Sequence, residues 1–305
     1  MKLACVFPGQ GSQKVGMGKD IYESCSIAKR VFDEVDDALN QNLSKIIFEG
    51  SNEELTLTEN AQPALMVCSI AMLKTLEKKL NKDLKDFCSY VAGHSLGEFT
   101  ALAATRSISL MDCARILKIR GQAMQEAVPI GKGAMFALLG ANIQVALDIA
   151  KEVDCDVAND NSPGQQVLSG TTESIDKAIK IAVQKGYKTI RLKVSAPFHS
   201  RLMRPAQEKL KEALEGISIT EPSVPLIANV LADITSAADI KKNLVEQVTG
   251  MVRWCDSIKR LQELGVTKIA EIGPGTVCTN LNKRIDGSLI TFTSDDLLSP
   301  DLEVL

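Results

Sequence analysis

A five-residue turn, Gly93-His94-Ser95-Leu96-Gly97, constrains this chain more than any other part of its sequence. It follows a strand-like run at 87–92 and precedes an alanine-rich stretch at 98–104 that has helical character. A sharp strand-to-helix turn lifts its central serine clear of both elements, and flanking glycines tolerate the crowded backbone. The unpaired N–H groups at the helix start would face any negative charge that forms there. The pattern predicts a nucleophile elbow at Ser95.

Only two histidines, His94 and His199, occur in the 305 residues. A serine hydroxyl is a poor nucleophile until a base accepts its proton, and imidazole is the usual base near neutral pH. We expect the His94 side chain to point away from Ser95, because the two residues are adjacent on a tight turn. His199 follows a strand-like run at 188–194 and is therefore the candidate base. Ser95 with His199 indicates acyl transfer or hydrolysis without deciding between them.

Composition excludes several other classes of protein. The hydrophobic content of 45% is enough for one large domain with a smaller insert. The 35 basic and 38 acidic residues give a net charge of −3, with no basic block suited to nucleic acid, so we expect no nucleic-acid partner. No run approaches the apolar length of a membrane span, and the apolar run at the N-terminus is too short for a signal peptide.

The eight cysteines are scattered and form no C-x-x-C pair. This spacing favours reduced thiols over a disulfide framework or a zinc site. We therefore expect a cytoplasmic protein, or one of an organellar matrix if a transit peptide has been removed. We also expect a monomer with no metal and no other cofactor.

Strands and helices alternate along most of the chain. We expect strands at 3–7, 87–92, 224–230 and 268–272, and helices at 19–39, 58–76, 98–104, 110–127, 201–214, 238–247 and 253–264. Thr58 is expected to cap its helix, with Pro63 in the first turns. This order predicts a mainly parallel sheet with helices on both faces.

The segment from about 131 to 194 has a different pattern. Strands at 134–140, 156–158, 166–170 and 187–194 and helices at 144–153 and 174–185 have the order β-α-β-β-α-β, which is typical of a ferredoxin-like unit. We predict an α/β fold: a parallel-sheet, α/β-hydrolase-like large domain of residues 1–128 and 196–305, interrupted by a ferredoxin-like small domain of residues 129–195. A cleft between the two would lie close to Ser95 and His199.

Seven short motifs occur in order along the chain: Pro8-Gly9-Gln10-Gly11-Ser12-Gln13, Gln62-Pro63-Ala64, Gly93-His94-Ser95-Leu96-Gly97-Glu98, Arg120-Gly121 with Met124-Gln125, Asn161-Ser162-Pro163-Gly164-Gln165, Phe198-His199-Ser200 and Glu271-Ile272-Gly273-Pro274-Gly275. Together they resemble the malonyl-CoA:acyl-carrier-protein transacylases of type II fatty-acid synthesis. The resemblance covers residues 1 to about 285. It implies a ping-pong reaction in which malonyl passes from malonyl-CoA to Ser95, and then to the phosphopantetheine thiol of acyl carrier protein.

The resemblance also implies roles for the residues around the serine. Ser95 would attack the thioester with His199 as base, and the backbone N–H groups of Gln10 and Leu96 would stabilise the oxyanion. The position of Leu96 supports this role independently of the resemblance, since it follows the nucleophile at the start of a helix. The family orients the histidine with a backbone carbonyl near Gln247 and not with a carboxylate.

Malonyl carries a carboxylate that must stay charged inside a cleft, and a planar guanidinium can bind it with two parallel hydrogen bonds. The resemblance assigns this role to Arg120, although Arg115 and Lys118 share its helix and a solvated helix face is the alternative. It places Met124 in the acyl pocket, where the alternative is a core methionine. Gln62 is expected to bridge the N-terminal loop to the elbow.

Asn161 is expected in a Ser-Pro-Gly loop, where it would either hydrogen-bond near the substrate or form an Asx turn. Phe198 is expected to restrict the space at the malonyl α-carbon, and His94 to support the site. Two positions depart from the family pattern. Met251 stands where relatives usually have proline, beside the carbonyl that orients the base. Asp160 adds a negative charge that would weaken the binding of an anionic acyl group if it faces the cleft.

Acyl carrier proteins are acidic, so a docking face for them should be basic. The candidates on either side of the cleft are Lys185, Lys188, Arg191, Lys193, Arg201, Arg204, Lys283 and Arg284. Two other functions stay open: a serine thioesterase or hydrolase of acyl-CoA, and a catalytically idle docking module. Arg120 and the missing acidic third member argue against the hydrolase, and the intact Ser95 and His199 argue against the idle module.

Overall fold

Two sheets organise the computed structural model, which describes residues 2–299. Met1 and residues 300–305 of the predicted large domain lie outside the described residues. The larger sheet has the strand order β10-β9-β1-β2-β7-β8, and the smaller sheet has the order β4-β5-β3-β6. In the larger sheet the pairs from β10 to β7 are parallel, and β8 pairs antiparallel with β7. The prediction of a mainly parallel sheet is confirmed.

The elements around the larger sheet come from both ends of the chain. Its strands are β1 (Lys2–Phe7), β2 (Tyr90–Gly93), β7 (Leu226–Ala228), β8 (Asp233–Ile234), β9 (Val266–Glu271) and β10 (Ile290–Phe292). The helices of this unit are α1 (Lys19–Ser24), α2 (Ser26–Leu39), α3 (Leu43–Glu49), α4 (Asn52–Thr56), α5 (Thr58–Leu80), α6 (Leu84–Phe87), α7 (Leu96–Ala104), α8 (Leu110–Glu126), η1 (Arg201–Met203), α11 (Arg204–Glu215), α12 (Ala237–Gln247), α13 (Trp254–Glu263), α14 (Val277–Ile285) and α15 (Ser294–Leu298).

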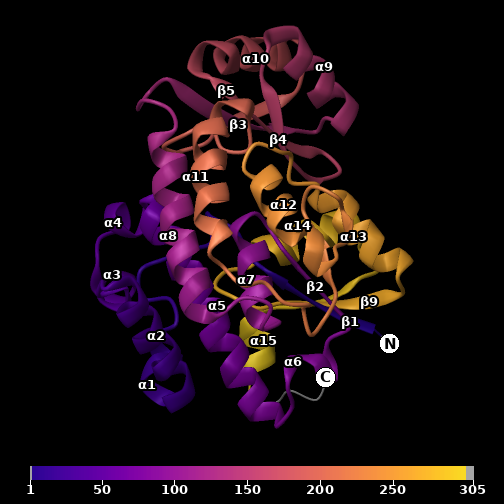
Figure 1. The fold of residues 1–305 in the computed structure, drawn as a ribbon. Coiled ribbons are helices and arrows are strands. Elements are labelled where there is room, and N and C mark those ends of the chain that lie inside the picture. The colour runs from indigo at the N-terminus through magenta and orange to yellow at the C-terminus, as the bar shows by residue number, and fades with distance from the viewer. Residues whose placement is uncertain (1, 300–305) are drawn as a thin grey trace.

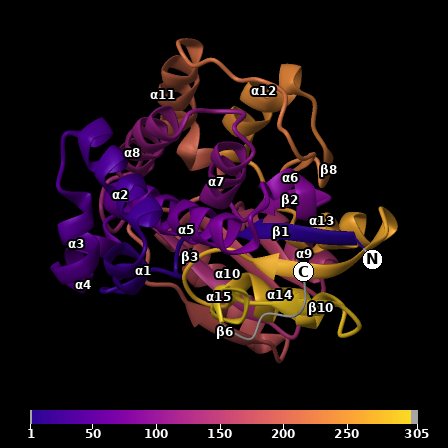
Figure 2. The same cartoon turned by 90° about the horizontal axis from the view of Figure 1, so that it is seen from below.

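Helices cover both faces of the larger sheet, as the view in Figure 2 shows. The central strand β1 is buried on both sides, because its alternate side chains enter different core clusters. Cys5 and Phe7 belong to the cluster under α2, α5, α7 and α8, whereas Ala4 and Val6 pack with Trp254 and the helices α13 and α14. The apolar run at the N-terminus is therefore a core strand.

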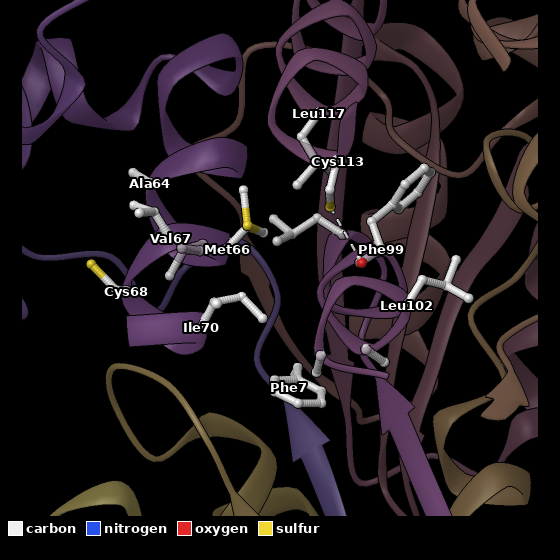
Figure 3. Close-up of a cluster of buried hydrophobic side chains, with 14 of the residues drawn as sticks. Phe7, Ala64, Met66, Val67, Cys68, Ile70, Phe99, Leu102, Cys113 and Leu117 are labelled. Carbon is white, nitrogen blue, oxygen red and sulfur yellow. Dashed lines mark hydrogen bonds between the residues drawn. The ribbon is translucent and has the colours of Figure 1, made fainter. Parts of the chain in front are cut away.

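The first of these clusters fixes the helix that follows the elbow (Figure 3). Phe99 and Leu102 of α7 are fully buried in the same cluster as Phe7 of β1 and Ile70 of α5. The thiol of Cys113 in α8 donates a hydrogen bond to the Phe99 carbonyl oxygen at 3.3 Å. Helix α7 thus has little freedom to move relative to the sheet.

The smaller sheet forms a unit with its own core, at the top of Figure 1. Its elements are β3 (Gly133–Leu139), α9 (Ile143–Val153), β4 (Asp156–Ser162), β5 (Gln165–Thr171), α10 (Thr172–Gln184) and β6 (Lys188–Arg191). All of its strand pairs are antiparallel. This is the β-α-β-β-α-β order expected from the sequence. The boundaries at 129 and 195 stay a prediction.

Several element boundaries differ from those predicted. The helix expected at 19–39 is broken at Cys25, whose backbone is extended (φ −124°, ψ 111°). The apolar spacing continues across this break, so periodicity alone cannot show it. The strand before the elbow begins at Tyr90, because residues 84–87 form the short helix α6.

The end of the small unit and one helix cap also differ. Strand β6 ends at Arg191 and not at 194, and the helix expected from 201 begins with the 3-10 turn η1. Thr58 is the first residue of α5 and not its cap, which is Leu57. The Thr58 hydroxyl instead lies 3.3 Å from that of Ser195. The Thr58 hydroxyl therefore bonds to a residue far away in the sequence and does not cap the helix.

Candidate active site

Ser95 lies at the elbow between β2 and α7 in a conformation that L-residues rarely adopt, with φ 54° and ψ −110°. The two flanking glycines make this possible. A Cβ atom at Gly93 would overlap the backbone of Gly97, and one at Gly97 would overlap the carbonyl oxygen of Phe7. The sequence-predicted elbow is present, and its serine lines a cavity.

His199 is placed to accept the Ser95 proton. Its Nε2 atom lies 2.7 Å from Ser95 Oγ, and its Nδ1 atom lies 2.8 Å from the Gln247 carbonyl oxygen. A carbonyl oxygen only accepts, so Nδ1 carries the proton and the Nε2 lone pair faces the serine hydroxyl. Burial, together with the positive charge of Arg120, lowers the pKa of His199 to about 3. The imidazole is therefore neutral and able to act as a base near pH 7.

Arg120 of α8 reaches the same serine from the other side. Its Nη2 atom donates to Ser95 Oγ at 3.1 Å and to Gln247 Oε1 at 2.9 Å, and Nη1 donates to Gln62 Oε1 at 2.7 Å. The side chain is 1% exposed. Burial lowers its pKa to about 10, so the guanidinium remains charged at neutral pH. Within residues 2–299 it forms no ion pair, which leaves its charge available to an anionic ligand.

The neighbouring cations of α8 behave differently. Arg115 is exposed and pairs with Asp112, whereas Lys118 pairs with Glu59. Burial therefore distinguishes Arg120 from the solvated face of its own helix, which the sequence left as an alternative.

A cavity of about 300 Å³ lies beside Ser95, and both units contribute to it. Met135, Asn159, Leu192, Lys193 and Val194 line it from the small unit or the segment that follows β6. Of the residues predicted for the site, the following also line it: Gln10, Gln62, His94, Ser95, Leu96, Arg120, Met124, Phe198 and His199. The predicted cleft between the two units is present.

The two backbone groups expected to bind the oxyanion lie next to the elbow. Leu96 is the first residue of α7, where a backbone N–H has no partner within the helix. The loop before Gln10 approaches closely, since a Cβ atom at Gly9 would lie 2.7 Å from the His94 carbonyl oxygen. Gln10 and Leu96 both line the cavity.

Three side chains differ from their predicted surroundings. Asn161 lies in strand β4 and not in a loop, and its Oδ1 atom is 2.8 Å from His94 Nε2. Gln62 does not bridge to the N-terminal loop: it bonds to Arg120 and lies 3.8 Å from Met124 Sδ. Asp160 does not line the cavity, because its carboxylate turns inward and accepts a hydrogen bond from Gln166.

His94 has the diverging side chain that the sequence predicts. Besides its bond to Asn161, its ring packs against Trp254 with a centroid distance of 5.4 Å. The segment at Met251 joins the two units: Met251 packs against the small core, and the neighbouring Val252 bonds to the backbone of β4 at 2.9 and 3.0 Å. With methionine at position 251, the Gln247 carbonyl oxygen still lies within hydrogen-bond distance of His199 Nδ1.

Two residues of the site, Glu98 and Asn229, were not predicted from the sequence, and both are 1% exposed. Asn229 accepts a hydrogen bond from the Ser95 N–H at 2.8 Å and donates one to the Gly93 carbonyl at 2.7 Å. Glu98 accepts from the Asn229 N–H at 3.1 Å. Glu98 is the one charged residue of the mainly apolar helix α7, which was a usable signal, whereas nothing local marks Asn229.

Two of the basic residues predicted for the docking face already form ion pairs within the chain. Arg191 forms an ion pair with Asp176, and Arg201 pairs with Asp154 and Asp156.

Among residues 2–299 no cluster of three or more His, Cys, Asp or Glu side chains could bind a metal ion. The same residues contain no helix that is long and apolar enough to span a membrane.

Residues 4–284 match the family model described as the acyl transferase domain. The chain belongs to this family. It is 47% identical to the malonyl CoA-acyl carrier protein transacylase of Bacillus subtilis strain 168, over 97% of this chain and 94% of the relative. The corresponding protein of Escherichia coli K12 is 39% identical over 94% of both chains. This chain is thus an acyltransferase, and Ser95 lies within the matched domain.

Solved structures agree with this family assignment. The acyl-carrier-protein S-malonyltransferase of Bartonella henselae superposes with a TM-score of 0.94 at 47% identity, covering 96% of this chain and 95% of that chain. A malonyl-transacylase in complex with a type II PKS acyl-carrier protein superposes with a TM-score of 0.92 at 38% identity, covering 96% of both chains. The fold of this chain is that of the malonyl transacylases.

Proposed function

We propose that this acyltransferase moves a malonyl group from malonyl-CoA to the phosphopantetheine thiol of an acyl carrier protein, and thereby supplies fatty-acid synthesis. One observation carries the proposal beyond the family: a buried, charged guanidinium, which forms no ion pair within residues 2–299, lies 3.1 Å from the hydroxyl of Ser95. An acyl group bound to this serine would lie against Arg120. A carboxylate on that group matches the guanidinium in charge and geometry.

The acylation step follows from the geometry around Ser95. His199 Nε2 accepts the hydroxyl proton while Oγ forms a bond to the thioester carbon of malonyl-CoA. The backbone N–H groups of Leu96 and Gln10 donate to the oxyanion that develops. Collapse of the tetrahedral intermediate breaks the C–S bond, and the leaving thiolate takes the proton from His199. The products are malonyl-Ser95 and free coenzyme A.

The second half of the reaction reverses these bonds with a different thiol. His199 takes the proton of the phosphopantetheine thiol, whose sulfur attacks the ester carbon, and Ser95 Oγ recovers the proton on leaving. The Gln247 carbonyl keeps the imidazole in the required tautomer throughout. It carries no full charge, so it stabilises imidazolium less than a carboxylate would.

Arg120 gives the site its selectivity in this scheme. Its Nη atoms are fixed by Gln62 and Gln247, so the guanidinium faces the acyl group without rearranging. Met124 and Phe198 line the same cavity and would contact the malonyl methylene. We further propose that the enzyme is cytoplasmic and monomeric, that residues 129–195 form its small domain, and that Lys188 and Lys193 contribute to the carrier-docking face.

Intact-mass measurement after incubation with malonyl-CoA tests the proposal. We expect the mass to increase by one malonyl group in the wild type and not in Ser95→Ala, and the group to leave when a phosphopantetheinylated carrier protein is added. Rapid loss of the adduct to water in the absence of any thiol would instead indicate a thioesterase. No adduct at all would indicate a protein that is catalytically idle.

A further inference from the structure

The side chain of Gln247 connects three functional parts of the site. Its Nε2 atom donates to Glu98 Oε2 at 2.7 Å and to the Ser95 carbonyl at 3.1 Å. Its Oε1 atom accepts from Arg120 Nη2 at 2.9 Å, and its backbone carbonyl bonds to His199. This one residue therefore contacts the nucleophile's backbone, the base and the arginine.

Only one orientation of the Gln247 amide satisfies its partners. Turned by half a rotation, the amide would place its NH₂ group against the guanidinium of Arg120. Its oxygen would then face the Glu98 carboxylate and the Ser95 carbonyl, both of which are acceptors. Gln247, Glu98 and Arg120 are buried, where an unmatched donor or acceptor has a high energetic cost. The observed orientation is therefore the stable one.

Glu98 supplies the acceptor that selects this orientation. It lies on α7 and does not line the cavity, so it does not contact the acyl group directly. Its Oε2 atom accepts from both Gln247 Nε2 and the Asn229 N–H. Burial raises the pKa of Glu98 to about 7, against the opposing effect of these two hydrogen bonds and of Arg120. Above that pH the carboxylate is an acceptor only.

We propose that Glu98 is a positioning residue for recognition of the acyl carboxylate: it fixes the Gln247 amide, whose oxygen in turn fixes Arg120. This inference rests on the proposed malonyl transfer. Without the acceptor at Glu98, Gln247 Nε2 keeps only its longer hydrogen bond to the Ser95 carbonyl, so the amide is held less firmly. When the amide turns, Arg120 loses one of the two partners of Nη2. Binding of a charged acyl group would then weaken, whereas an uncharged acetyl group would lose little.

Two conservative variants separate the position of the acceptor from its charge. In E98Q the amide oxygen can occupy the Oε2 position and accept both hydrogen bonds, although the charge is gone. In E98D the charge remains, but the carboxylate is drawn back by one methylene, about 1.5 Å. Thr100→Ala is the matched control, because Thr100 is equally buried on the same helix and its hydroxyl has no hydrogen-bond partner among the described residues.

The measurement is single-turnover acylation by malonyl-CoA and by acetyl-CoA at pH 8, where Glu98 is ionised, with melting temperatures to show that each variant folds. We expect the ratio of malonyl to acetyl specificity to fall about tenfold or more in E98D. We expect E98Q and Thr100→Ala to keep the ratio of the wild type. If E98D does not fold, Q247L, which removes the amide but keeps the backbone carbonyl, takes its place with the same expectation.

The role of Glu98 would be overturned if E98D kept the wild-type ratio of malonyl to acetyl specificity. It would also be overturned if E98Q lowered this ratio. Either result leaves malonyl transfer itself intact, provided that the wild type acylates Ser95 and prefers malonyl-CoA. A wild type that forms no malonyl adduct would instead overturn the proposed function, and the role of Glu98 with it. The two failures are therefore distinguishable.

Discussion

His199 and Glu98 carry opposite pKa shifts, and each links folding to pH. The folded-state pKa of His199 lies near 3, below its ordinary value of 6.5, so the unfolded chain binds the extra proton between these values. Its contribution to stability is complete above pH 6.5 and is lost as pH falls. The pKa of Glu98 is raised from 4.5 to about 7. Its contribution is complete below pH 4.5 and is lost as pH rises through 7.

A comparison of the wild type with His199→Gln isolates the histidine, because Glu98 remains in both proteins. We expect the difference in free energy of unfolding, wild type minus variant, to rise with pH between about 4 and 6.5. The slope is at most about 1.4 kcal/mol per pH unit. Urea unfolding at several pH values measures it. A difference that stays constant over this range would show that His199 keeps an ordinary pKa.

At the residue scale, the site residues that belong to recognisable motifs were predicted from the sequence. The hydrogen bonds that hold these residues in place were not predicted. Ser95, His199 and Arg120 were all identified, and the structure brings them together. The partners of Glu98 and Gln62 were not foreseen, since Glu98 meets Gln247 across 149 positions and Gln62 meets Arg120 across 58. Hydrogen bonds of such separation depend on the whole fold and leave no local pattern.

At the element scale, the elbow depends on the absence of a side chain at Gly97, where a Cβ atom would overlap the Phe7 carbonyl. We expect Gly97→Ala to push α7 away from β1, to destabilise the protein by about 1–3 kcal/mol and to abolish most of the acylation activity. Thermal unfolding and acylation of Ser95 measure the two effects.

Gly216 provides the matched control for Gly97. It has φ −80°, which any residue can adopt, and a Cβ atom there would meet no atom of residues 2–299 within 4 Å. We expect Gly216→Ala to be neutral or slightly stabilising and fully active. Equal effects of the two substitutions would show that the crowding at Gly97 is unimportant.

The order of strands and helices was predictable because their hydrophobic periods persist over many residues. The breaks between elements were harder to predict. The apolar spacing continues through Cys25, and Phe87, which was predicted as the first residue of a strand, is the last residue of the short helix α6. The helices α3, α4, α14 and α15 and the short edge strands β8 and β10 were also missed. Elements of one or two turns carry too few residues for a period to show.

At the scale of the whole molecule, the cavity is formed where the two units meet, and Lys193 lines it from an exposed position after β6. Because acyl carrier proteins are acidic, we expect Lys193→Glu to slow transfer from malonyl-Ser95 to carrier protein several-fold at low salt. Transfer to free pantetheine should change little. Deacylation rates with the two acceptors measure this.

Lys82→Glu supplies the control for net charge, because Lys82 is exposed in the turn between α5 and α6. Helix α6 lies at the opposite end of the molecule from the small unit (Figure 1). Its rates with both acceptors should match those of the wild type. If the two variants slow carrier transfer equally, the effect comes from overall charge and not from a docking face.

The specificity of Arg120→Ala tests the central claim most directly, namely that a buried guanidinium beside Ser95 recognises the acyl carboxylate. Truncating one partner of a buried, hydrogen-bonded charge pair costs about 2–5 kcal/mol, which corresponds to a loss of about 30-fold or more in kcat/KM for malonyl-CoA. Acetyl-CoA has no carboxylate to lose, so its kcat/KM should stay the same or rise. A fall by the same factor for both substrates would contradict the claim and make Arg120 a structural residue.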